Sequence, residues 1–136
     1  MWDFIKENWM SLTALIISLI GFFKDNIKEV IIHNKTKKED KSAKLTISFI
    51  NEKLIISNKG KANARNVKIY IDDKEVQKSE TFGAYAQNMD FSLLTANNSI
   101  GIKSIVHMSS KRNFRIKVTW EDDNSKNNIT EDVINI

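Results

Sequence analysis

The chain has 136 residues, of which 41% are hydrophobic and 28% are charged, a balance that excludes both a disordered tail and a protein with many membrane spans. It contains no Pro and no Cys, which excludes disulfides and thiolate metal sites. Its net charge of +4 is spread evenly, with eight Lys and six acidic residues in residues 1–44 and thirteen Lys or Arg and eleven acidic residues in residues 45–136. Because nucleic-acid-binding proteins usually cluster their basic residues, we expect no nucleic-acid partner.

The first predicted element is a helix over the uncharged run from Asn8 to Phe23. Its large apolar residues point to all sides of a helix, which is typical of a helix buried in a bilayer. The run rises only about 24 Å against a hydrocarbon core of about 30 Å, so its flanks must supply the rest. We predict a single-pass transmembrane anchor at residues 1–23, with membrane lipid as a partner. The anchor residues are Trp9, Leu12, Leu15, Ile16, Leu19, Ile20, Phe22 and Phe23.

Two rival interpretations of this run fit less well. A cleavable signal peptide needs small residues before its cleavage site, but the run ends in Gly-Phe-Phe-Lys. A helix that lies on the membrane surface needs a polar face, which the run lacks. The segment from Lys24 to Lys44 contains seven Lys and four acidic residues, so the positive-inside rule predicts a C-terminal domain in the cytoplasm.

Four small residues within the run lie at helical spacing: Ser11, Ala14, Ser18 and Gly21. Small residues let transmembrane helices approach closely, so this stripe could drive self-association into a homo-oligomer. The alternative is that these residues simply face lipid, and the sequence leaves both interpretations open.

Residues 24–43 are predicted as a basic helix that ends in a linker. Phe23, Ile27, Val30 and Ile31 recur at helical spacing, which extends the helix beyond the anchor. After Asn34 the sequence is wholly polar and reads as a linker or a frayed helix end.

From residue 44 to residue 136 the apolar residues alternate with period two, which predicts β-strands. Residues 45–50 and 54–56 form a hairpin around a tight turn at Asn51-Glu52, and residues 67–71 form a third strand that ends at the turn pair Asp72-Asp73. The segment 58–66 between them is too long for a hairpin turn. It contains Gly60, which can adopt positive φ, and the small residues Ala62 and Ala64, so we expect an arch that carries the chain between two sheets.

The stretch ISNKGKANARNVKIYID, residues 56–72, resembles a pattern of immunoglobulin-like sandwich domains of the CARDB and fibronectin-III-like type. With the apolar N-terminal segment, the chain is similar to uncharacterised membrane-anchored bacterial or phage proteins that have such a domain. The resemblance implies a mainly β, immunoglobulin-like antiparallel sandwich of about seven strands, preceded by one N-terminal transmembrane helix. It implies a fold rather than a chemistry.

The later strands follow the same period. We expect a short edge segment marked by Val76 and Phe82, a strand at 91–94, and another that runs from Ile100 to Met108. The clearest alternation covers Asn113 to Glu121, and residues 129–136 close the domain.

Few residues suggest catalysis, and we predict no enzymatic activity, cofactor or metal site. His107 is expected on a strand, where packing is the simpler role, and the motifs of phosphate loops and hydrolases are absent from the sequence. The acidic turns at 72–73 and 121–124 could bind a hard cation, but ordinary turns are the favoured interpretation.

Two basic clusters are the candidate contacts for a partner or lipid, together with an isolated Tyr85 expected in a loop. One cluster is Lys59, Lys61, Arg65 and Lys68, and the other is Lys111, Arg112, Arg115 and Lys117. If both lay at one end of the sandwich they could bind an acidic partner, whereas the simpler interpretation is a solvated surface.

The first functional hypothesis is therefore a non-enzymatic, membrane-anchored protein whose β domain binds another, unknown protein. The alternative is a membrane effector that oligomerises through its helix and perturbs the bilayer, with the β domain as a sensor. A third is an exported domain that faces the cell wall.

Overall fold

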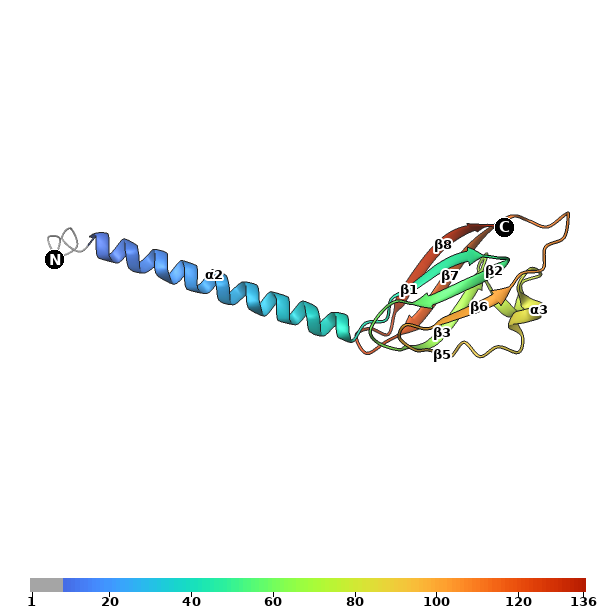
Figure 1. The fold of residues 1–136 in the computed structure, drawn as a ribbon, viewed down its shortest axis with the longest axis horizontal. Coiled ribbons are helices and arrows are strands. Elements are labelled where there is room, and N and C mark those ends of the chain that lie inside the picture. Colours follow the sequence, from blue (N-terminus) through green and yellow to red (C-terminus); the bar gives the residue numbers. More distant parts are fainter. Residues whose placement is uncertain (1–8) are drawn as a thin grey trace. The chain divides into compact units, whose positions relative to one another are not determined.

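The computed structural model describes residues 9–136, apart from the side chains at positions 10, 12 and 25. The chain divides into two compact units, Met1–Lys37 and Lys38–Ile136, and each is described by itself. Helix α2 (Trp9–Asp40) makes up the described part of the first unit and ends in the second (Figure 1). It is continuous through the polar sequence KTKKED, where a linker or frayed end was expected.

The predicted transmembrane anchor is wrong, because no helix of the described residues is long and apolar enough to cross a membrane. The uncharged run ends at Phe23, and α2 continues through Lys24 and Lys28 into a strongly charged segment. The single-pass topology, the membrane localisation and the cytoplasmic orientation derived from this run are therefore wrong as well. Residues 1–8, the first part of the predicted anchor, lie outside the described residues. The anchor residues in the described part belong to the first half of α2: Trp9, Leu12, Leu15, Ile16, Leu19, Ile20, Phe22 and Phe23.

The second unit contains two antiparallel sheets. The three-stranded sheet has the order β1-β2-β6, formed by β1 (Leu45–Ile50), β2 (Lys53–Asn58) and β6 (Ser99–Lys103). The five-stranded sheet has the order β4-β3-β7-β8, formed by β4 (Lys74–Glu75), β3 (Ala64–Ile71), β7 (Asn113–Glu121) and β8 (Asn128–Asn135), and β5 (Leu93–Leu94) also pairs with β3. A short 3-10 helix η1 (Val76–Lys78) and a single helical turn α3 (Gly83–Ala86) connect β4 to β5. Figure 1 shows the strands of the two sheets running along this unit, and α3 lies at one end of it.

The mainly β character is confirmed, with eight strands in the described residues instead of about seven. The core lies between the sheets. Leu54, Ile56 and Ile102 from one sheet and Ile116 and Val118 from the other are fully buried, as the alternating pattern of β7 predicts.

Two hairpins form through two-residue turns. Ile50 pairs with Lys53 around Asn51-Glu52, and Ile71 pairs with Lys74 around Asp72-Asp73. All four turn residues have φ between 48° and 66°. Positive φ at both central positions is the mark of a type I′ turn, whose twist matches that of the strands, and Asn and Asp tolerate it well.

The arch from Asn58 to Ala64 carries the chain from the three-stranded to the five-stranded sheet, as predicted. Gly60 is needed there for close approach rather than for positive φ: a Cβ on it would lie 2.5 Å from Ser42 O and even closer to Lys44 N. The buried side chain of Asn58 holds the arch. Its Oδ1 accepts the main-chain N–H groups of Lys44 (3.1 Å) and Gly60 (3.0 Å), and its Nδ2 donates to Ala62 O (2.8 Å) and Leu94 O (3.1 Å).

A bulge in β3 explains the apolar spacing in the second half of the stretch at residues 56–72. The pairing with β7 shifts between Arg65 and Lys68, and Asn66 at the shift has φ 50°. The bulge lets Ala64 and Val67, three residues apart, both face the core.

Two predicted segments have a different structure. The segment from Val76 to Phe82, expected as an edge strand, leads through η1 towards α3, although both apolar residues are buried. The strand expected from Ile100 to Met108 ends at Lys103, and Met108 is fully exposed.

Candidate functional site

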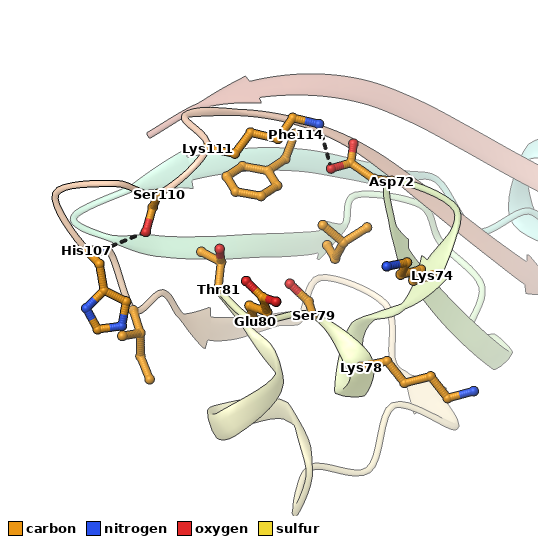
Figure 2. Close-up of a pocket in the computed structure, with 12 residues that line it drawn as sticks. Asp72, Lys74, Lys78, Ser79, Glu80, Thr81, His107, Ser110, Lys111 and Phe114 are labelled. Carbon is orange, nitrogen blue, oxygen red and sulfur yellow. Dashed lines mark hydrogen bonds and ion pairs between the residues drawn. The ribbon is translucent and has the colours of Figure 1, made fainter.

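A cavity of about 310 Å³ lies at the end of the second unit where β3 ends and β7 begins. We call it the end cavity. Its walls come from the β3–β4 turn, the segment from η1 to α3, the loop between β6 and β7, and the start of β7. Figure 2 shows the polar side chains of Asp72, Lys74, Glu80 and Lys111 around it, with the ring of Phe114 as its apolar wall.

Asp72 is the best-anchored acidic residue of the end cavity. Its carboxylate accepts hydrogen bonds from Arg115 N (3.0 Å) and from Lys111 Nζ (2.9 Å). Burial raises the pKa of Asp72, but the hydrogen bonds from Arg115 and Lys111 outweigh that effect and hold the pKa below its usual value. Asp72 is therefore an ionised residue whose charge is already matched, and it fixes the β6–β7 loop against the β3–β4 turn.

The second predicted basic cluster lies beside this cavity and is largely paired. Arg115 Nη2 is 2.6 Å from Asp73 Oδ2, and Lys117 Nζ is 3.7 Å from Asp73 Oδ1 and 5.1 Å from the ring centre of Tyr70. The exposed Arg112 holds the C-terminus through its carbonyl oxygen, which accepts the N–H of Ile136 (2.8 Å). These contacts hold the β6–β7 loop and the start of β7 in place, and they leave little unpaired positive charge in this cluster.

Most of the first predicted basic cluster lies at the opposite end of β3, with Lys59 and Lys61 in the arch and Arg65 near the start of the strand, whereas Lys68 lies in the middle of β3. Lys61 Nζ is 2.8 Å from Asp40 Oδ1, and Arg65 Nη1 is 2.8 Å from Asp123 Oδ1. These hydrogen bonds to the carboxylates raise the pKa of both basic side chains. Lys59 and Lys68 are exposed. Lys68 pairs with Thr119 on β7, two residues from Lys117, so this member of the first cluster lies near the second. Arg65 lies six residues before the end of β3, about 20 Å away, so the structure does not bring the two clusters together as whole groups.

No sequence pattern indicates that several residues of the end cavity belong to one site. Lys74, Lys78, Ser79, Glu80 and Thr81 meet the β6–β7 loop only because the type I′ turn folds η1 back along β3. His107, which was expected to pack on a strand, is instead exposed in this loop and lines the cavity. Its main-chain N–H donates to Ser110 Oγ (2.8 Å), as Figure 2 shows.

The acidic turn after β7 is structural. One Asp122 oxygen accepts Ala43 N (2.9 Å), and the other accepts Asn124 N (2.9 Å) and Ser125 N (2.8 Å). Burial raises the pKa of Asp122, and these main-chain hydrogen bonds lower it further than burial raises it. Within residues 9–136, His, Asp and Glu do not gather in groups of three that could hold a metal ion.

The remaining predicted site residues are exposed. Tyr85 lies on α3 rather than in a loop, with its side chain exposed. Ser11, Ser18 and Gly21 lie in α2 on one face with Ala14, and a Cβ on Gly21 would meet nothing within 4 Å. Self-association through this stripe stays a prediction.

Fold and site together define a mainly β protein that has a long N-terminal helix and a polar cavity between the loops at one end of its sheets. Residues 7–136 match the model of the family described as Domain of unknown function (DUF8453), and the chain belongs to this family. No curated protein and no solved structure matches the chain. The immunoglobulin-like assignment therefore stays a prediction.

Proposed function

We propose that the protein acts by binding another protein, and that the end cavity receives acidic side chains of that partner. The observation that carries the proposal is the state of the charges around the cavity. The charge of Asp72 is matched by Lys111 and the N–H of Arg115. The remaining charged lining residues are Lys74 and Lys78 against the single carboxylate of Glu80, which leaves an excess of positive charge at the rim. The carboxylate of Glu75 lies 3.8 Å from Lys78 Nζ, at an exposed position where such a pair is weak.

The size of the end cavity supports a protein ligand. A volume of about 310 Å³ is at the lower limit of small-molecule pockets, which span roughly 300–1,000 Å³. One or two side chains of a partner would fill it. Charge-assisted hydrogen bonds from Lys to a carboxylate are among the stronger contacts available at such a surface.

The serine hydroxyls of the cavity favour binding over nucleophilic catalysis. Ser79 Oγ accepts the main-chain N–H of Phe82 (3.3 Å), and Ser110 Oγ accepts that of His107 (2.8 Å). Both hydroxyls therefore hold loops in place. Bilayer perturbation is not proposed, because it depended on the transmembrane span that the structure overturns.

The test is the fluorescence anisotropy of a labelled hexaglutamate peptide titrated with the full chain. The double variant Lys74→Glu/Lys78→Glu should weaken binding by at least about tenfold, because two charge-assisted contacts become repulsive. The control Lys59→Glu/Lys68→Glu makes the same change in net charge at two exposed residues that do not line the cavity, and it should weaken binding by less than about threefold. Equal weakening by both pairs would show that only the net charge matters and would refute the proposed site.

A further inference from the structure

Helix α2 carries a continuous exposed apolar seam. From Ile16 the seam runs through Ile20, Phe23, Ile27 and Val30, at alternating steps of four and three residues, and each of these side chains is exposed. The same steps reach back through Thr13 to Trp9 and forward to Asn34. Steps of four and three are the heptad spacing of a helix that packs along another helix.

We infer that copies of this chain associate in water through this seam, as a parallel coiled coil of α2 helices. A heptad seam packs best against another helix whose apolar residues have the same period. A second copy of the chain supplies such a helix over the whole length of α2. Leu19 and Ile31 flank the seam and are also exposed, so the apolar surface is wider than the two positions per heptad of a minimal coiled coil. Asn34 lies at a seam position, where a single Asn fixes the register of a coiled coil at some cost in stability.

The area available is sufficient for a stable interface. Each large apolar side chain of the seam offers on the order of 60–120 Å². Eight such residues give roughly 500–1,000 Å² per helix, against the approximately 800 Å² per partner of a standard interface. The eight are Trp9, Ile16, Leu19, Ile20, Phe23, Ile27, Val30 and Ile31.

The distribution of charge along α2 favours a parallel arrangement. The first half is uncharged up to Phe23, and the second half contains Lys24, Lys28 and the KTKKED sequence. In an antiparallel pair the charged half would cover the apolar half of its partner. In a parallel pair the two apolar halves bury each other.

The inferred interface differs from the small-residue stripe predicted from the sequence. At 3.6 residues per turn, Ala14 and Ser18 lie on the face of α2 opposite Ile16 and Ile20. Small residues drive association where lipid removes the hydrophobic driving force. In water the large apolar side chains supply that force.

The first test is light scattering of the full chain after size exclusion, at tens of micromolar. The wild type should have at least twice the monomer mass, and Ile16→Glu/Phe23→Glu should reduce it to the monomer mass. The control Leu15→Glu/Phe22→Glu changes the neighbouring residues, which are similarly exposed (62% and 66%, against 48% and 60%), but off the seam. It should remain assembled. A monomeric wild type, or dissociation by both pairs alike, would overturn the inference.

A second test does not depend on disrupting the helix. The sequence has no Cys, so a single cysteine reports one position. Mild oxidation of Ile27→Cys should yield a disulfide-linked dimer at least about five times more abundantly than oxidation of Lys28→Cys, which lies off the seam, about 100° around α2 from Ile27. Equal yields from the two variants, or no dimer from either, would contradict a parallel seam and point to a different occupant.

Discussion

The carboxylate of Asp122 accepts a hydrogen bond from the main-chain N–H of Ala43, 79 residues earlier in the chain, at 2.9 Å. Ala43 lies two residues before the start of β1, and Asp122 immediately follows β7. One buried side chain therefore joins the entrance of the β unit to the end of its central strand. The same carboxylate closes the turn that leads to β8 through the N–H groups of Asn124 and Ser125.

Asp122→Ala should lower the free energy of unfolding by about 3 kcal/mol. Hydrogen bonds to a charged group contribute about 1.5–3 kcal/mol, and the substitution leaves three main-chain donors without their acceptor. Urea denaturation measures the change. The neighbouring Asp123→Ala removes only an exposed ion pair with Arg65 and should cost less than about 1 kcal/mol. Similar losses in the two variants would mean that Asp122 does not have this role.

Acid should destabilise the fold through Asp122 and Asp72. Burial raises the pKa of each group, but hydrogen bonding lowers it further, so both folded pKa values lie below the unfolded value of 3.8. The unfolded chain therefore binds more protons near this pH. The stabilisation is complete well above pH 3.8 and is lost as the pH falls through the folded pKa values. Unfolding free energies measured from pH 6 to pH 2.5 should fall with pH, and less steeply in Asp122→Asn; an unchanged slope would count against the assignment.

Gly60→Ala should destabilise the protein by several kcal/mol, because the new Cβ would overlap the main chain of residues 42–44 and neither segment can yield easily. The matched substitution is Gly101→Ala in β6, where the nearest atom to the added Cβ is Lys53 Cδ at 3.9 Å. It should be neutral or slightly stabilising in thermal unfolding. A tolerated alanine at position 60 would show that the arch is loosely packed.

Phe82→Ala should cost about 3–5 kcal/mol. The Phe82 side chain is fully buried, and its ring meets that of Phe114 edge-on, with 5.8 Å between centroids. Tyr85→Ala, on the exposed face of the same short segment, should change chemical denaturation little. A small effect at Phe82 would indicate that the η1–α3 segment is not part of the core.

The sequence predicted the elements in which local chemistry and packing agree. Phe114, Ile116, Val118 and Trp120 alternate through β7. The turn residues Asn51, Asp72 and Asp73 are of the types that tolerate the positive φ their hairpins require. The sequence also predicts the arch, although over 58–66, whereas β3 already begins at Ala64. It predicts dihedral freedom as the role of Gly60, whereas the structure requires its missing side chain.

The failures have identifiable causes. The predicted span rests on an apolar run that is short. Because α2 continues beyond this run into charged residues, the helix is not apolar enough over a sufficient length to cross a membrane. Ile105 and Met108 continued the apolar spacing of β6, but the strand pairs with β2 only as far as Lys103. The end cavity was missed because its residues come from separate loops, and only the tertiary fold brings Lys74 and Lys78 near His107.

The most direct test of the binding function is photo-crosslinking from the end cavity of the full chain in its own cells. A photoreactive amino acid at position 107 should crosslink to one protein with an acidic surface, identified by mass spectrometry. Lys74→Glu/Lys78→Glu should abolish that product, and Lys59→Glu/Lys68→Glu should leave it. The absence of a specific product from position 107, or a product that survives reversal of the charges at the cavity rim, would contradict binding through the end cavity.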